Sequence, residues 1–181
     1  MAISLRTRRI IRNSFHYPLG ETPPPTAILV NWFHAPRFRF GRKDSVRVFA
    51  NAREAAQFAP EVLVATSEQL LTLNSAIVPT IKRALVALIR PEERLLSAAE
   101  RDRLWRAFKV PVFEQIVGMS GELLAAECEA HDGLHLHSSE WTPSEDVYSI
   151  DRATCACGSK LPRLSAPELT ERVRKMAAYA R

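Results

Sequence analysis

The sequence contains little cysteine, little glycine and no long apolar run. Only three of its 181 residues are cysteine, and an odd number without a secretory signal argues against a disulfide framework. No segment approaches the ~18–20 apolar residues of a transmembrane helix, so we expect no contact with a membrane. The longest apolar run near the start, residues 27–30, ends at a polar residue, so no signal peptide is expected. We therefore expect a cytoplasmic protein whose thiols are free or bound to a metal.

The positive charge of the chain is concentrated near its start. Residues 1–43 contain eight Lys and Arg against one acid, Glu21, whereas the remainder contains 17 basic and 19 acidic residues, which gives the overall +5. The arginine-rich residues 5–12 suit a transit peptide or a polyanion-binding arm, although a solvated or subunit-contacting segment is the simpler interpretation. No aromatic residues alternate with base-contacting ones, so we do not expect a nucleic-acid partner. The remaining options are a protein partner or a homo-oligomer.

The order of the predicted elements is typical of an α/β protein. The composition, 46% hydrophobic and 25% charged, is that of a globular domain. Short apolar runs rich in β-branched residues predict strands at 26–33, 45–49, 61–65, 84–89 and 110–116. Between them, helical patterns occupy 51–58, 66–73 and 97–108. This alternation with short links predicts a mostly parallel sheet with flanking helices.

Side-chain patterns mark where the predicted helices begin. The candidate caps are Asn51 alone, Thr66 with Gln69, and Ser97 with Glu100, the last two being capping-box pairs. In the helix at 97–108, Leu104, Trp105 and Phe108 recur at helical spacing and predict an apolar face.

The pattern changes beyond residue 120. Two short strands, 122–127 and 134–137, are predicted around a turn at 131–133, followed by a polar, irregular region at 138–154 and an extended piece at 160–164. We therefore divide the chain into four parts: a basic arm with a proline-rich linker (1–25), an α/β region (26–120), a small metal-binding β lobe (121–164) and a C-terminal helix (165–181).

All three cysteines and three of the five histidines lie between residues 128 and 158. Three thiolates and one imidazole form a complete tetrahedral ligand set for Zn²⁺. Cys155 and Cys157 can reach one ion from a tight turn, for which Gly158 gives backbone room. Simpler interpretations are buried or idle thiols and a solvated histidine turn. A catalytic zinc or a nucleophilic Cys128–His131 pair are further alternatives, but four filled positions favour a structural ion.

Three segments resemble phenylacetate–coenzyme A ligase and its adenylate-forming relatives. They are residues 112–120, 126–135 and 155–163, which correspond to the family's aromatic-Gly-x-Ser/Thr-Glu motif, its E-C-x-x-x-D-G-L-H segment and its C-x-C-G segment with a following Pro-Arg. The resemblance extends over roughly residues 58–164. It implies a structural zinc held by the following side chains, with His131 and His137 as substitutes for the imidazole: Cys128, His135, Cys155 and Cys157.

The departures from the family bear on catalysis. Val117 replaces the aromatic residue, Gly121 replaces a Mg²⁺-binding Glu, and residues 90–93 (Arg-Pro-Glu-Glu) replace the glycine-containing segment beside the adenine. The family's Gly-rich phosphate loop and its domain with a catalytic Lys have no counterpart in the sequence. We therefore expect neither adenylation nor binding of ATP, AMP or coenzyme A, and we predict no catalytic residues.

These observations lead to three hypotheses. The first is a stand-alone, truncated and non-catalytic relative of the ligases that carries a structural zinc and acts as a binding or accessory protein. The second is an acyl- or nucleotide-binding ligase subunit whose active site is completed by a partner chain. The third is a nucleic-acid-binding zinc protein that uses the arginine-rich residues 6–12.

Overall fold

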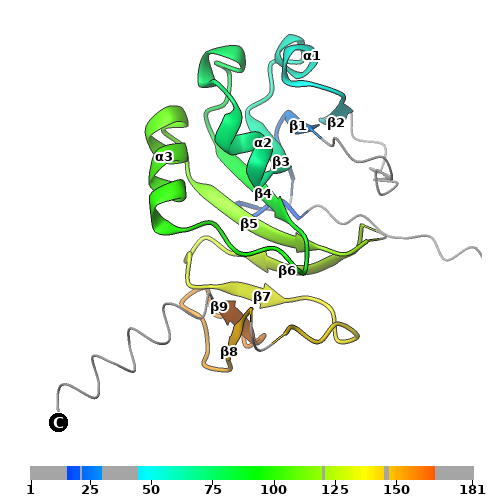
Figure 1. Ribbon diagram of the computed structural model, residues 1–181, viewed down its shortest axis with the longest axis vertical. Coiled ribbons are helices and arrows are strands. Elements are labelled where there is room, and N and C mark those ends of the chain that lie inside the picture. Colours follow the sequence, from blue (N-terminus) through cyan, green and yellow to red (C-terminus); the bar gives the residue numbers. More distant parts are fainter. Residues whose placement is uncertain (1–15, 21, 30–44, 120, 145–146, 166–181) are drawn as a thin grey trace, which may run out of the picture.

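The computed structural model describes residues 16–20, 22–29, 45–119, 121–144 and 147–165. Nine strands in this part of the chain form one sheet in the order β2-β1-β3-β4-β5-β6-β7-β9-β8 (Figure 1). The strands are β1 (Thr26–Leu29), β2 (Val46–Phe49), β3 (Val62–Thr66), β4 (Ala84–Ile89), β5 (Val112–Val117), β6 (Leu123–Glu127), β7 (Leu134–Leu136), β8 (Ser149–Asp151) and β9 (Arg163–Ser165). The helices are α1 (Ala52–Gln57), α2 (Ser67–Thr72), the 3₁₀ helix η1 (Ser75–Ile77) and α3 (Ala98–Phe108).

The sheet is mixed, so the prediction of a mostly parallel sheet is wrong. β2, β1, β3, β4 and β5 are parallel neighbours, but every pairing from β5 to β8 is antiparallel. The links 118–122 and 128–133 are too short for the crossover that a parallel pairing requires. The predicted α/β class is retained, and the strands of the predicted metal lobe extend the same sheet.

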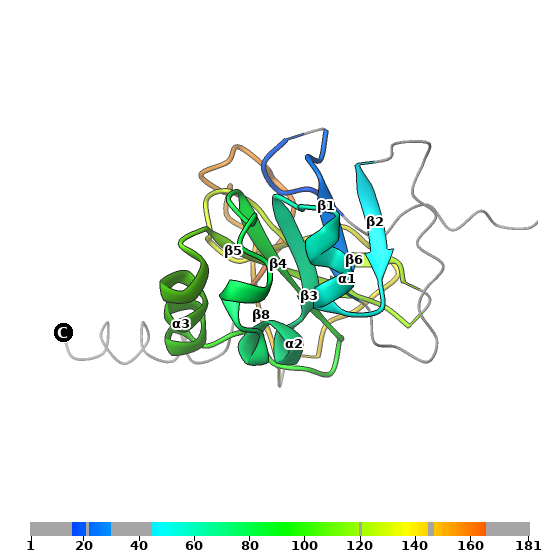
Figure 2. The ribbon, with the colours of Figure 1, turned by 90° about the horizontal axis from the view of Figure 1, so that it is seen from above.

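The helices cover one face of the parallel half of the sheet (Figure 2). Ala55, Leu70 and Leu104, one from each α-helix, belong to one buried cluster with alternate side chains of β1, β3 and β4. The intervening strand residues form a second cluster with Tyr17 on the opposite face. The antiparallel half has a third cluster, in which Ile89 and Ile116 meet residues of β6, β7 and β9. The antiparallel half therefore shares its apolar core with the parallel strands.

The predicted helix caps are confirmed. The Asn51 side chain accepts from the Glu54 N–H, and both capping boxes are formed, Thr66 with Gln69 and Ser97 with Glu100. The buried face of α3 is narrower than predicted. Leu104 and Phe108 are buried, but Trp105 is 52% exposed and the Lys109 ammonium lies 4.6 Å from the centre of its ring.

The remaining predictions concern β8, β9 and the two ends of the chain. β8 lies within residues 138–154, so the prediction that this whole region is irregular is wrong. The strand forms by pairing with β9, and its sequence has no apolar pattern that predicts it. The extended piece predicted at 160–164 corresponds to β9, displaced toward the C-terminus. The arm at 1–15, residues 30–33 of the first predicted strand and the helix after residue 165 lie outside the described residues. No helix in the described ranges has both the length and the apolar character that crossing a bilayer requires.

Adjacent positions of α3 test this packing. We expect Leu104→Ala to lower the free energy of unfolding by about 2–5 kcal/mol, because it leaves a cavity in the core. Trp105→Ala should cost less than about 1 kcal/mol, since it removes an exposed ring and one cation–π contact. Urea unfolding of both variants provides the comparison, and equal losses would contradict the orientation of α3.

Candidate metal centre

Four side chains from three separate parts of the sequence meet at the antiparallel end of the sheet. Cys128 directly follows β6, His135 lies in β7, and Cys155 and Cys157 lie in the turn between β8 and β9. The pairing of β6 with β7 sets Ala126 opposite His135, and β9 lies on the other side of β7. As a result, the four potential ligand atoms all lie within 4.8 Å of one another.

Two distances within this cluster match those of a tetrahedral metal site. The sulfurs of Cys128 and Cys155 are 3.7 Å apart, and Nε2 of His135 is 3.4 Å from the sulfur of Cys157. Bonds of about 2.3 Å to sulfur and about 2.0–2.1 Å to nitrogen give tetrahedral ligand separations of about 3.8 Å for S···S and about 3.6 Å for S···N. A disulfide would require about 2.05 Å. The cluster can therefore hold a metal ion, and its donor set is compatible with zinc.

The predicted substitutes lie outside the cluster. His131 stacks on Phe113, with ring centres 4.6 Å apart, and its Nδ1 is 3.0 Å from the Glu127 carboxylate. His137 lies beside His16, with ring centres 5.8 Å apart, and burial lowers the pKa of both imidazoles. Of the three candidate imidazoles, the structure thus brings only that of His135 to the three thiols.

Two turns with glycines at positive φ position the ligands. Gly133, between Cys128 and His135, has φ +86°, and a Cβ there would lie 2.6 Å from the backbone oxygen of Leu164. Gly158 has φ +85°, and its N–H donates to the Cys155 carbonyl at 2.9 Å. The Cys155 N–H in turn donates to the Ser159 carbonyl at 3.0 Å, which closes the turn that carries both thiols.

Arg163 joins these turns electrostatically. Its buried guanidinium forms ion pairs with Asp132, in the turn between β6 and β7, and with Asp151 in β8. The pKa of Cys155 is lowered, chiefly by the N–H of Cys157 and also by the positive charge of Arg163. In contrast, burial and the two neighbouring thiols raise the pKa of Cys128 to about 12. A divalent cation would supply the positive charge that three thiolates need, and its binding would release thiol protons.

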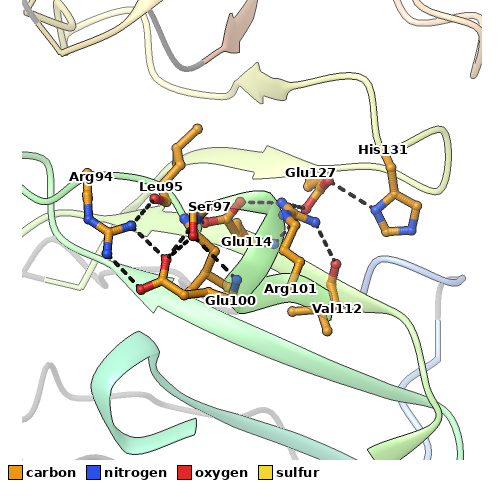
Figure 3. Close-up of polar contacts among 10 residues, drawn as sticks. Arg94, Leu95, Ser97, Glu100, Arg101, Val112, Glu114, Glu127 and His131 are labelled. Carbon is orange, nitrogen blue, oxygen red and sulfur yellow. Dashed lines mark hydrogen bonds and ion pairs between the residues drawn. The ribbon is translucent and has the colours of Figure 1, made fainter. Parts of the chain in front are cut away.

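A buried ion network joins α3 to β5 and β6 (Figure 3). The Arg101 guanidinium of α3 contacts the carboxylates of Glu114 in β5 and Glu127 in β6, the latter at 2.8 Å. Both carboxylates are almost fully buried, at 1% and 3% side-chain exposure. Glu127 also accepts from the backbone N–H of Glu114 at 2.9 Å, and Glu114 accepts from that of Leu96 at 2.6 Å. Since Glu127 directly precedes Cys128, this network fixes the start of the turn between β6 and β7, which carries the first thiol of the cluster.

The sequence prediction missed this network. No local pattern in the sequence pairs Arg101 with Glu114 or Glu127. Burial raises the pKa of Glu114, although the charge of Arg101 opposes the shift. The available signal was Glu114 itself, a charged residue inside the apolar run of β5, but its partners are 13 positions away on either side.

A cavity of about 740 Å³ lies apart from the cluster, at the carboxyl ends of β3 and β4. Open α/β sheets bind ligands at this end of their strands. Its wall includes Ser67 of α2 and Arg94 and Glu100 near the start of α3. Arg94 holds Glu100 through two hydrogen bonds of 2.7 Å and lowers its pKa to about 2 (Figure 3). Tyr148 donates from its hydroxyl to the Glu93 carbonyl at 2.9 Å and so anchors the loop after β4.

Comparison with solved structures shows that the fold is similar to part of a coenzyme A ligase. A crystal structure of an open conformation of 2-hydroxyisobutyryl-CoA ligase, in complex with 2-HIB-AMP and CoA, matches with a TM-score of 0.53 and 14% sequence identity. The match covers 79% of this chain and 44% of the ligase chain, so the present chain spans less than half of that enzyme. No protein-family profile and no curated protein sequence matches. At this identity the likeness concerns the fold alone.

Arg101 and Arg106, both on α3, test the buried network. We expect Arg101→Met to lower the free energy of unfolding by roughly 2–4 kcal/mol, because it leaves two buried carboxylates without their cation while 28% of Arg101 already faces solvent. The control, Arg106→Met, breaks the exposed pair with Asp102 and should cost less than about 0.5 kcal/mol. Urea unfolding at neutral pH measures both, and similar costs would contradict a structural role of the network.

The two glycines provide a second test. Gly133→Ala should destabilise by about 2–4 kcal/mol, since it combines a strained positive φ with a collision against Leu164. Gly158→Ala has the same strain but nothing within 4 Å of its Cβ, so we expect a cost of only about 1–2 kcal/mol. Thermal unfolding at equal metal content distinguishes the two variants, and a larger loss for Gly158→Ala would contradict the close contact between Gly133 and Leu164.

Proposed function

We propose that this chain is a zinc-binding, non-catalytic relative of the phenylacetate–coenzyme A ligase-like branch of the adenylate-forming enzymes, acting as a binding or accessory protein. The observation that carries the proposal is the cluster of Cys128, His135, Cys155 and Cys157, whose ligand atoms lie within 4.8 Å of one another. The proposed partner is a protein or a second copy of the chain, and the proposed location is the cytoplasm, where thiols stay reduced.

The proposed role of the zinc is structural. The ligands come from the hairpin of β6 and β7 and from the turn between β8 and β9, which lie far apart in the sequence. One ion with four protein ligands would crosslink the three segments and leave no open position for a substrate. Binding energy of this kind adds directly to folding stability.

The proposed lack of catalysis rests on the residues at the expected nucleotide site. Val117 ends β5 without an aromatic ring, and Gly121 occupies the position of the Mg²⁺-binding Glu. Glu122, one position later, folds back beside Gly118, where a Cβ would meet its carboxylate oxygen. The loop at 90–93 is anchored by Tyr148 and carries charged side chains in place of a glycine surface for adenine.

Metal content tests the proposal. Protein purified without chelators should contain about one equivalent of zinc, and Cys155→Ser should lose the zinc together with about 5–10 °C of thermal stability. His131→Ala is the matched control, because His131 lies outside the cluster, and it should keep the metal. Correctly folded protein with less than about 0.2 equivalents of zinc would contradict the proposal.

A second candidate function is favoured by the cavity of about 740 Å³ at the carboxyl ends of β3 and β4. Its volume suits a small molecule, so the chain would be an acyl- or nucleotide-binding subunit that completes its active site with a partner. Calorimetry with ATP, AMP and coenzyme A discriminates between the candidates. Saturable binding at micromolar concentrations would favour the subunit, and the absence of heat would favour the accessory protein.

A further inference from the structure

A small cavity of about 190 Å³ adjoins the cysteine and histidine cluster. Three cluster residues, Cys128, His135 and Cys157, form part of its wall, and His16 and His137 form another part. Its volume is below the range of about 300–1,000 Å³ typical of organic ligands, but it accommodates an ion with bound water. Of the four cluster residues, only Cys157 is exposed.

Backbone hydrogen bonds hold His16 and His137 in position. The His16 N–H donates to the Gln115 side chain at 3.3 Å, and the amide of Gln115 donates back to the His16 carbonyl. Gln115 is fully buried in β5, so this double contact attaches the N-terminal segment to the sheet across 99 positions of sequence. His137 is held by its N–H, which donates to the Leu124 carbonyl at 2.8 Å.

The spacing of the two rings suits a shared metal ion. Their centres are 5.8 Å apart and the ring planes are inclined by 40°. Two imidazoles that bind one ion through bonds of about 2.0–2.1 Å have ring centres about 5–6 Å apart. Among the described residues no hydrogen bond between the two rings accounts for this arrangement. Imidazole is a preferred ligand of zinc, copper, nickel and iron.

The charge of the neighbouring cluster also favours a cation in this cavity. Three thiolates around one divalent ion leave a net charge of −1, which attracts a second cation to the adjoining cavity. We propose that His16 and His137 bind a second transition-metal ion in this cavity, with water as the remaining ligands. The inference rests on the proposed function, in which a zinc ion occupies the neighbouring cluster.

Counting metal ions tests the inference. Chain isolated with its zinc is titrated with Co²⁺, and native mass spectrometry counts the ions bound. We expect the wild type to hold two ions, and His16→Gln combined with His137→Gln to hold one. Each single substitution should weaken binding of the second ion at least about tenfold. His131→Gln, which alters a histidine outside the cavity, should still hold two.

The two sites fail in different ways. Cys155→Ser removes a ligand of the first ion, whereas the double histidine variant leaves all four cluster ligands in place. A wild type that keeps one ion at saturating Co²⁺ would overturn the second site but leave the zinc proposal intact. A double variant that still binds two ions would show that the second ion binds elsewhere and would equally overturn the inference. A folded wild type with no zinc would contradict the proposed function itself.

Discussion

The sharing of one arginine by two buried carboxylates is the constraint on which the rest of this structure depends. Arg101 reaches from α3 to Glu114 and Glu127, which lie on neighbouring antiparallel strands. A carboxylate removed from water is strongly unfavourable unless it is paired and hydrogen-bonded, so the helix and both strands must keep their relative positions. The network lies where the parallel half of the sheet meets the antiparallel half, and it therefore joins the two.

The proposed metal centre depends on this network through the polypeptide chain. Glu127 is tied to Arg101 and to the backbone of Glu114, and the next residue is the first cluster thiol, Cys128. On the other side of the cluster, Arg163 pairs with Asp132 and Asp151. Two cationic side chains thus orient the segments that carry the thiols. A zinc ion would add a third positive centre in the same region.

Predictions from local patterns succeeded where the physical cause was local. The caps at Asn51, Thr66 and Ser97 depend on side chains within three residues, and all three are formed. Predictions failed where the cause lay in distant contacts. Trp105 has helical spacing but is exposed. β8 has no apolar pattern that predicts a strand, and it forms through its pairing with β9. The prediction of a mostly parallel sheet failed because the strands after β5 join the same sheet in antiparallel pairings, and their direction follows from the length of the links.

The sequence by itself determined which side chains could form a metal centre, because only three thiols exist and they lie close to three imidazoles along the chain. It also determined the order of strands and helices, through apolar periodicity and capping. Only the tertiary structure decided which imidazole joins the thiols, since His135 has its ligand atom within 4.8 Å of all three and His131 and His137 are not part of that group. The tertiary structure likewise decided the pairing of Arg101 with two carboxylates and the meeting of His16 with His137. These contacts depend on strand register, which aligns residues that no local pattern connects.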